Sequence, residues 1–164
     1  MSADLGLPPA DAGALAERFA IDEIVSCYAA GLDSQDWDLW RSIFVPEPIF
    51  DMTSVHGRPA QRASIDTTIA LVRTQFAGFA ATQHVIVNRR HTLDGDRARV
   101  LATMQAWHWI DERCYTMFGY YDDRLVRTAA GWRLDHVQLN LTRTEGDPKV
   151  MGDAFRKGRA LLDS

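Results

Sequence analysis

The stretch Arg97–Ile110, which reads RARVLATMQAWHWI, decides the fold because its side chains alternate between two kinds. One set is small or apolar and ends in a histidine: Ala98, Val100, Ala102, Met104, Ala106 and His108. The other set includes the polar residues Arg97, Arg99, Thr103 and Gln105. A period of two places the sets on opposite faces of a β-strand. We therefore expect one buried face whose small residues leave room for a ligand.

The same period continues in the neighbouring segments. Three more long strands are predicted, at residues 82–93, 113–128 and 132–142, and their short separators are typical of antiparallel hairpins. Helical spacing of apolar residues instead predicts helices over residues 14–32, 37–44, 65–76 and 148–162, with a short strand at 48–52. Helices followed by an antiparallel meander define an α+β chain.

The composition fits one folded unit. The chain has 164 residues, of which 46% are hydrophobic and 24% are charged, as in ordinary globular domains. Residues 1–13, rich in Ala, Gly, Pro and Asp, are expected to be a flexible terminus before a single domain at 14–164.

Several classes of protein are disfavoured. The formal charge is −4 and no basic tract is present, so a nucleic-acid partner is not expected. No signal peptide or apolar run of about 18 residues indicates a membrane segment. Two isolated cysteines, Cys27 and Cys114, favour a cytoplasmic protein without disulfides. Nucleotide, serine-hydrolase and zincin motifs are missing, so we expect neither a cofactor nor a metal.

Two histidines and two helical residues are the candidates for catalysis. His84 lies on a strand whose faces both look buried, so we expect a central strand and a hydrogen-bond partner, for which Asp33 is a candidate. Local spacing alone favours a solvated turn for Asp33, and His108 would equally suit a core histidine bonded to a carbonyl. Tyr28 lies five residues before Asp33 and is either a site residue or a buried tyrosine with a satisfied hydroxyl.

Further side chains are candidates for contact with a substrate. Met104 lies on the small-residue face, and Asn88 shares one face of its strand with His84 and Ile86. Tyr121 and Asp51 complete this group. Asp51 is a weaker candidate, as is Asp123, because most aspartates in such positions are structural.

Three segments together resemble a known family. They are Tyr28-Ala-Ala-Gly-Leu-Asp-Ser-Gln-Asp-Trp-Asp38, Thr82-Gln-His84 and Gly131-Trp-Arg133. Their order and spacing, from about Leu15 to Pro148, resemble the SnoaL-like family of the nuclear-transport-factor-2-like superfamily. Within it the chain is similar to scytalone dehydratases and bile-acid 7-alpha-dehydratases.

The resemblance implies a cone-shaped α+β barrel, with a curved, mostly antiparallel sheet around N-terminal helices and one enclosed apolar pocket. By position, Asp33 would orient His84 as general base or acid, Tyr28 would polarise a carbonyl or hydroxyl, and His108 would match a second histidine. Asn140 lies near the position of an arginine in the bile-acid enzymes and is added to the substrate contacts. Leu32 and Met52 stand where scytalone dehydratases have tyrosines.

The expected function is that of a cofactor-independent dehydratase (lyase) or isomerase acting on a polycyclic, steroid- or polyketide-like hydroxy-carbonyl compound. The alternatives are a polyketide cyclase working by intramolecular aldol closure, a non-catalytic small-molecule-binding or assembly domain, and the small subunit of a ring-hydroxylating dioxygenase. A small apolar or aromatic substrate is the expected partner. Large side chains on the outer sheet face, Trp107, Trp109 and Tyr115, suggest a homodimer or homotrimer.

Overall fold

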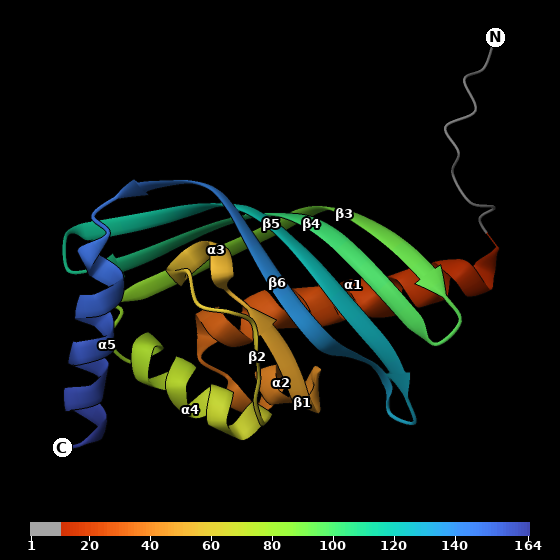
Figure 1. Ribbon diagram of the computed structural model, residues 1–164, viewed down its shortest axis with the longest axis horizontal. Coiled ribbons are helices and arrows are strands. Elements are labelled where there is room, and N and C mark those ends of the chain that lie inside the picture. Colours follow the sequence, from red (N-terminus) through yellow and green to blue (C-terminus); the bar gives the residue numbers. More distant parts are fainter. Residues whose placement is uncertain (1–10) are drawn as a thin grey trace, which may run out of the picture.

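The computed structural model describes residues 11–164, in which five helices surround a curved sheet (Figure 1). The helices are α1 (Ala12–Ser34), α2 (Trp37–Ser42), α3 (Thr53–His56), α4 (Ile65–Phe76) and α5 (Lys149–Leu162). The strands are β1 (Phe44–Asp51), β2 (Gln61–Arg62), β3 (Ala81–Asp94), β4 (Arg97–Ile110), β5 (Arg113–Thr128) and β6 (Gly131–Gly146).

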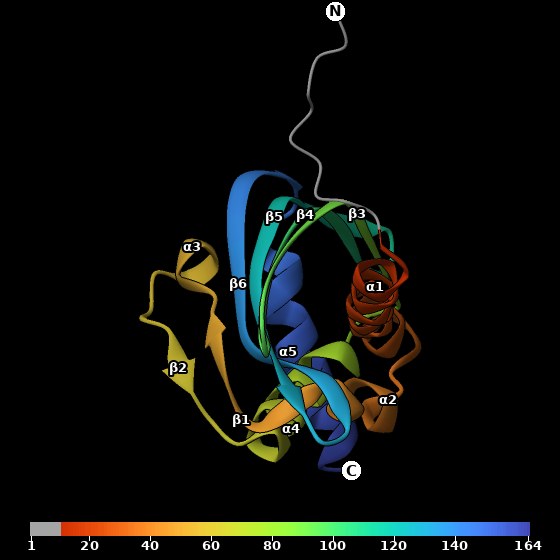
Figure 2. The same ribbon diagram turned by 90° about the vertical axis from the view of Figure 1, so that its right-hand side faces the viewer.

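The six strands form one sheet in the order β2-β1-β6-β5-β4-β3. All neighbouring strands are antiparallel except β1 and β6, which are parallel. The predicted α+β class with a curved, mostly antiparallel sheet is therefore confirmed. The sheet does not close into a barrel, because β2 and β3 remain as edges. Seen end-on, α1 lies along β3, and α2 and α4 lie on the concave side (Figure 2).

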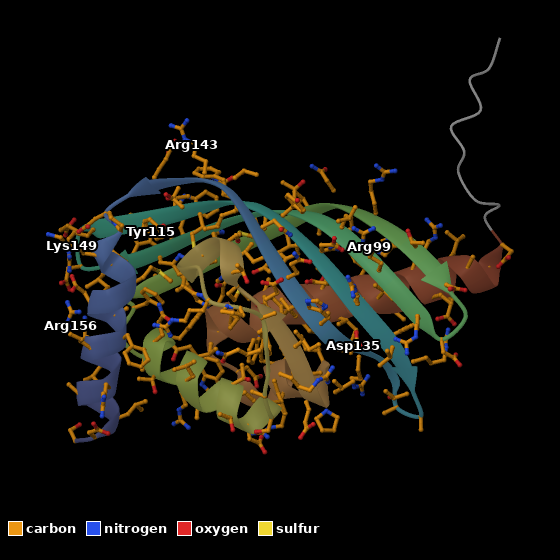
Figure 3. The ribbon with its side chains drawn as sticks, in the orientation of Figure 1. Arg99, Tyr115, Asp135, Arg143, Lys149 and Arg156 are labelled. Atoms are coloured by element: carbon orange, nitrogen blue, oxygen red, sulfur yellow. The ribbon has the colours of Figure 1, made fainter. Side chains whose placement is uncertain are left out.

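The core lies between the concave face of the sheet and the helices. On α1 the buried stripe is Ile21, Val25, Tyr28 and Leu32, which recur at helical spacing. On β4 the alternation is as predicted, with every second residue from Ala98 to Ile110 buried. Phe19 on the same helix is 66% exposed, because it lies off the face that meets the sheet. Side chains fill the space inside the cone, and Arg143 points away from it on the convex side (Figure 3).

The N-terminal half departs from the sequence prediction in three places. Strand β1 starts at Phe44 instead of residue 48 and includes Pro46 and Pro48. Its pairing with β6 shifts between Phe44 and Ile49, since a proline has no N–H to donate to a ladder. The segment expected to be a loop contains α3 and β2. Helix α1 begins at Ala12, inside the predicted flexible segment 1–13, and residues 1–10 lie outside the described part of the chain.

Strand β3 is an edge strand, so the expectation of a central strand was wrong. Helix α1 packs along its inner side, where Asp33 contacts His84 and Asp22 contacts His91, whereas Val87 on the outer side is 44% exposed. A register shift between Val87 and Arg90 marks a β-bulge, and Asn88 there has a φ of 54°. The bulge interrupts the alternation. The alternation predicted that Asn88 shares the face of Ile86. Because of the bulge, Asn88 is instead exposed, whereas Ile86 is buried.

Among the described helices, none is both long and apolar enough to span a bilayer.

Candidate active site

The carboxylate of Asp33 and the imidazole of His84 are in direct contact at the junction of α1 and β3. Asp33 Oδ1 lies 2.7 Å from His84 Nδ1, and Asp33 Oδ2 accepts a hydrogen bond of 2.7 Å from the backbone N–H of His84. The Thr82 hydroxyl donates a third bond, 2.8 Å long, to Oδ1. Both carboxylate oxygens are thereby held in place. An ionised Asp33 can only accept a hydrogen bond, so the neutral His84 ring carries its proton on Nδ1. Its Nε2 is then free to accept a proton.

The local sequence explains why these groups meet. Helix α1 continues through Asp33 to Ser34, and Gln35 ends it in the left-handed conformation. Asp33 therefore lies on the last turn, where it caps no helix and is free to face β3. Thr82 and His84 are two residues apart on a strand and so share a face. This spacing is the signal that identifies the Thr82 hydroxyl, which the sequence interpretation did not single out.

Asp33 is held in its charged form. Burial raises the pKa of Asp33. The hydrogen bond from the His84 ring, the charge of that ring, and the hydrogen bonds from the His84 backbone N–H and the Thr82 hydroxyl together outweigh burial. The pKa of Asp33 therefore lies below its usual value. The side chain of His84 is 6% exposed and that of Asp33 is 25% exposed. The pair is thus mostly shielded from solvent.

His108 faces His84 from the neighbouring strand. The ring centroids are 5.5 Å apart and the planes are nearly perpendicular, at 89°. His108 is 4% exposed, and its Nδ1 has no hydrogen-bond partner among the described residues. Burial, followed by the charge of His84, lowers the pKa of His108 to about 4, although the Tyr115 backbone and Asp33 oppose this shift. His108 is therefore neutral near pH 7, with one ring nitrogen available to a ligand.

Aromatic side chains surround the two imidazoles. Phe76, at the end of α4, stacks against His84 with centroids 6.2 Å apart and planes 17° apart. Phe79 packs against His108 at 5.1 Å, and Trp37 packs edge-on against Phe76 at 6.1 Å. These residues form an apolar wall around the polar groups, which suits flat hydrophobic ligands.

Tyr28 and Tyr121 also lie in the interior. Their ring centroids are 5.5 Å apart, and both residues are buried. Met104 is buried on the inner face of β4. The structure therefore brings together, on the concave side of the sheet, six residues that the sequence proposed for the site: Tyr28, Asp33, His84, Met104, His108 and Tyr121.

Three other sequence candidates lie elsewhere. Asn88 is exposed at the bulge of β3. Asn140 pairs with the outward-facing Tyr120, which places it on the outer face of the sheet. Asp51 accepts a hydrogen bond of 3.0 Å from the backbone of Thr53 and so holds the start of α3. These three side chains are not directed into the interior beside His84.

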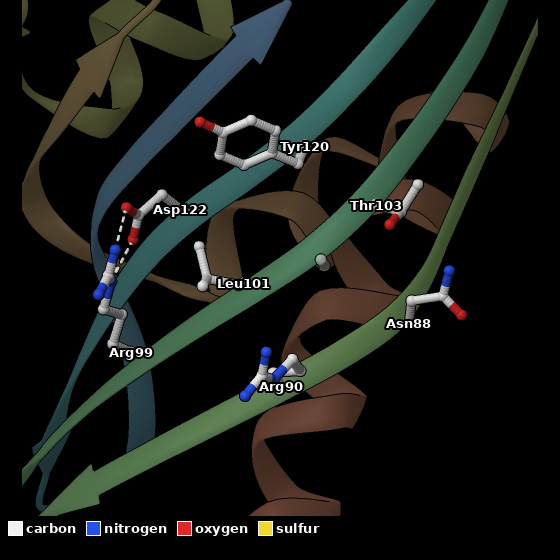
Figure 4. Close-up of a pocket in the computed structure, with 8 residues that line it drawn as sticks. Asn88, Arg90, Arg99, Leu101, Thr103, Tyr120 and Asp122 are labelled. Atoms are coloured by element: carbon white, nitrogen blue, oxygen red, sulfur yellow. Dashed lines mark hydrogen bonds and ion pairs between the residues drawn. The ribbon is translucent and has the colours of Figure 1, made fainter. Parts of the chain in front are cut away.

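Two surface hollows are described in residues 11–164, and neither is lined by Asp33 or His84. The larger, of about 580 Å³, lies on the outer sheet face (Figure 4). Its lining includes Arg90, Leu101 and Tyr120 and an ion pair between Arg99 and Asp122. The smaller, of about 400 Å³, lies between α1 and β3 around Asp22 and Arg89. Neither hollow is the single enclosed apolar pocket that the resemblance implies. Within residues 11–164, no three or more His, Cys, Asp or Glu side chains are grouped to hold a metal ion.

Comparison with known proteins points to one family and one fold. A family model described as a SnoaL-like domain matches residues 13–138. The Kfla4162 protein from Kribbella flavida superposes with a TM-score of 0.78 at 33% identity, covering 80% of this chain and 95% of that chain.

Two more distant structures share the fold. A proposed scytalone dehydratase from Novosphingobium aromaticivorans has a TM-score of 0.71 at 20% identity, covering 82% of this chain and 89% of its own. The hexachlorocyclohexane dehydrochlorinase LinA-type3 from Novosphingobium barchaimii has a TM-score of 0.72 at 16% identity, covering 85% of this chain and 95% of its own.

Thr82→Val should destabilise the protein, because it removes the hydroxyl that donates to the charged Asp33 while keeping the shape of the side chain. We expect the free energy of unfolding to fall by about 1.5–3 kcal/mol, as measured by urea denaturation. Thr82→Ser keeps the donor and should recover most of the loss. Equal stability of the valine variant and the wild type would show that the hydroxyl does not hold Asp33.

His108 should make the protein less stable as the pH falls from about 6.5 to 4. The unfolded chain binds a proton near the ordinary pKa of 6.5, whereas the folded chain resists protonation until about pH 4. The free energy of unfolding should therefore decrease through this window by about 3 kcal/mol more in the wild type than in His108→Phe. Denaturation at a series of pH values measures this difference. Replacing the exposed His56 by Asn serves as the control and should leave the slope unchanged.

Proposed function

The chain belongs to the SnoaL-like domain family, and on this basis we propose that it is a cofactor-independent acid–base enzyme. The proposed reaction is an elimination of water, or an isomerisation, on a polycyclic, steroid- or polyketide-like hydroxy-carbonyl compound. The observation that carries the proposal is the 2.7 Å contact between Asp33 and His84 within an aromatic interior. The names of two fold neighbours, a dehydratase and a dehydrochlorinase, denote eliminations and agree with it.

His84 supplies the base. With Nδ1–H directed at Asp33, Nε2 carries the free lone pair, and Asp33 stabilises the imidazolium that forms when Nε2 takes a proton. Thr82 and the His84 backbone keep the carboxylate from turning away from the ring. Proton transfer by such a positioned group typically accelerates a reaction by about 10²–10⁴-fold.

The chemical steps balance without any added reagent. His84 Nε2 removes the proton on the carbon next to the substrate carbonyl, and the C–H electrons form an enolate. The carbonyl then re-forms as the electrons make a C=C bond and the C–O bond to the hydroxyl breaks. The imidazolium returns its proton to the departing oxygen, which leaves as water. If the proton instead returns to another carbon, the outcome is an isomerisation.

The surroundings of the pair favour a flat hydrophobic substrate. Phe76 and Phe79 pack against the two imidazoles, so a bound ring system takes the place of part of this aromatic packing. Nδ1 of the neutral His108 has no partner among the described residues and can accept a hydrogen bond from a substrate hydroxyl. A buried polar atom without a partner costs stability, and a ligand that satisfies it recovers that cost.

We also propose self-association, as a homodimer or homotrimer, through the outer face of the sheet. Val87 and Tyr120 are 44% and 41% exposed there. Trp107 and Trp109 are partly exposed on the same face, together with Phe118. Tyr115 was expected there as well, but it pairs with the inward-facing His108 and lies on the inner face. Apolar side chains exposed on one face of a sheet are a feature of protein interfaces.

Replacing His84 should strongly slow turnover of hydroxy-ketones, because His84 is the imidazole that Asp33 holds with Nε2 free to take the proton. We expect His84→Gln to lower kcat by about 10²–10⁴-fold, measured as loss of water from a panel of cyclic hydroxy-ketones.

His91→Gln is a closely matched control. His91 lies on the same strand, has a 7% exposed side chain and binds an α1 aspartate, Asp22, at 2.9 Å, but it lies away from His108. Full activity of His84→Gln, or equal losses in both variants, would refute the assignment.

The outer face can be tested by light scattering. The wild type should have a mass that is a multiple of 18.4 kDa, and the double variant Val87→Glu/Tyr120→Glu should have the monomer mass, because charges on the face oppose its burial. Leu71→Glu, at an exposed position on α4, should not change the mass. A monomeric wild type would contradict the proposal.

A further inference from the structure

The larger of the two hollows lies away from the candidate active site, on the outer face of the sheet (Figure 4). Its volume is about 580 Å³, a size typical of small-molecule sites. The bulge of β3 forms one wall of the hollow, because it turns Asn88 and Arg90 toward this face. Strand β4 forms the floor and β5 the opposite wall. Their lining side chains are Arg99, Leu101, Thr103, Tyr120 and Asp122.

Arginines concentrate positive charge at this hollow. Arg90 and Arg99 line it, and Arg124 stands directly opposite Arg99 on the neighbouring strand. Side chains in that relation have Cβ atoms about 4.5–5.5 Å apart, and like charges there destabilise a sheet. The same row continues from Arg124 to His136 of β6, which cannot neutralise an arginine in either protonation state. The whole chain has a formal charge of −4, so this positive charge is a local feature.

The carboxylate of Asp122 is the counter-ion of Arg99. It accepts a hydrogen bond of 2.6 Å from Arg99 Nε and another of 2.5 Å from Nη2. Arg90 and Arg124 form no ion pair among the residues that the structure describes. Two guanidinium groups beside the hollow are thus left without a described counter-ion, although their repulsion costs stability.

We propose that the outer hollow binds a small organic molecule through a phosphate group. A phosphate monoester carries a charge of about −1.5 to −2 at pH 7, which matches the two arginines without a described counter-ion, whereas a carboxylate brings a single charge. Arginine also presents its N–H donors in a planar fork that fits phosphate oxygens. The exposed guanidinium of Arg90 is the main donor, and the charge of Arg124 adds attraction across the β4–β5 pair.

The rest of the lining suits both parts of such a molecule. Thr103 and Tyr120 stand directly opposite each other and supply two hydroxyls that can donate to phosphate oxygens. Leu101, the cross-strand partner of Arg90, and the 41% exposed ring of Tyr120 offer apolar surface for the organic part. A phosphate ester can therefore use polar and apolar contacts at once.

This site is separate from the Asp33–His84 pair. His84 contacts α1 on the inner side of the sheet, whereas the hollow lies on the outer side. Binding of a phosphate there does not require the proposed elimination to occur. Tyr120 also belongs to the face proposed for self-association, so the hollow borders that face.

Isothermal titration calorimetry with phenyl phosphate tests the site. The wild type should bind this probe with a Kd below about 1 mM, bind benzoate more weakly and show no binding of phenol. Arg90→Gln should raise the Kd for phenyl phosphate about 10- to 100-fold, because it removes a hydrogen bond between two charged groups. Asp122→Asn should instead lower the Kd, because it frees Arg99 and removes a negative charge from the hollow.

Arg143→Gln is the matched control, since it removes the same charge from an exposed arginine on the outer side of β6, away from the hollow (Figure 3). It should leave the Kd unchanged, as should His84→Gln on the inner side. Circular dichroism and light scattering should show that Arg90→Gln is folded and has the mass of the wild type.

Four results would each overturn the proposal. The first two are failure of the wild type to bind phenyl phosphate and equal affinity for benzoate. The third is an equal loss of affinity in Arg90→Gln and Arg143→Gln. The fourth is a change of mass as the sole effect of Arg90→Gln, which would assign the arginine to an interface between copies of the chain.

Discussion

The structure depends on how the exposed edge of β3 is covered. An edge strand presents backbone N–H groups without a strand partner, and Asp33 of α1 accepts one of them, from His84, at 2.7 Å. The same carboxylate holds the His84 ring and the Thr82 hydroxyl. One side chain therefore accepts a hydrogen bond from the edge strand, fixes α1 against the sheet and orients the candidate base. About three helical turns earlier, Asp22 binds His91 of the same strand, so the helix is held at two points.

The interior contains two carboxyl groups in opposite states, and the difference is one of partners. Asp33 is partly buried but accepts three hydrogen bonds, which hold its pKa down. Asp123 is more deeply buried and has a single backbone donor, so its pKa rises. Which of the two carboxyl groups is charged is therefore set by its hydrogen-bond partners as well as by its burial.

Much of the fold was predictable because its signals are local. The alternation of β4 predicted its bounds and its buried face, and the spacing of Ile65, Ile69 and Phe76 predicted α4. The irregular part was less predictable. Pro46 and Pro48 obscured the start of β1, and a single bulge moved Asn88 to the surface. For the site, the resemblance paired Asp33 with His84, whereas local spacing alone favoured a solvated turn at Asp33. The Thr82 hydroxyl and the buried state of Asp123 were evident from neither.

The sequence by itself determined the α+β class, the long strands and most helices, and the side chains available for acid–base chemistry, since period and capping act over a few residues. Tertiary structure decided that β3 is an edge, that β1 runs parallel to β6, and that Asp33 reaches His84 across 51 positions of the chain. It also decided which carboxyl group is charged. These properties depend on strand register and on the partners that folding brings together, and the solvation of a carboxyl group is set by neighbours distant in sequence.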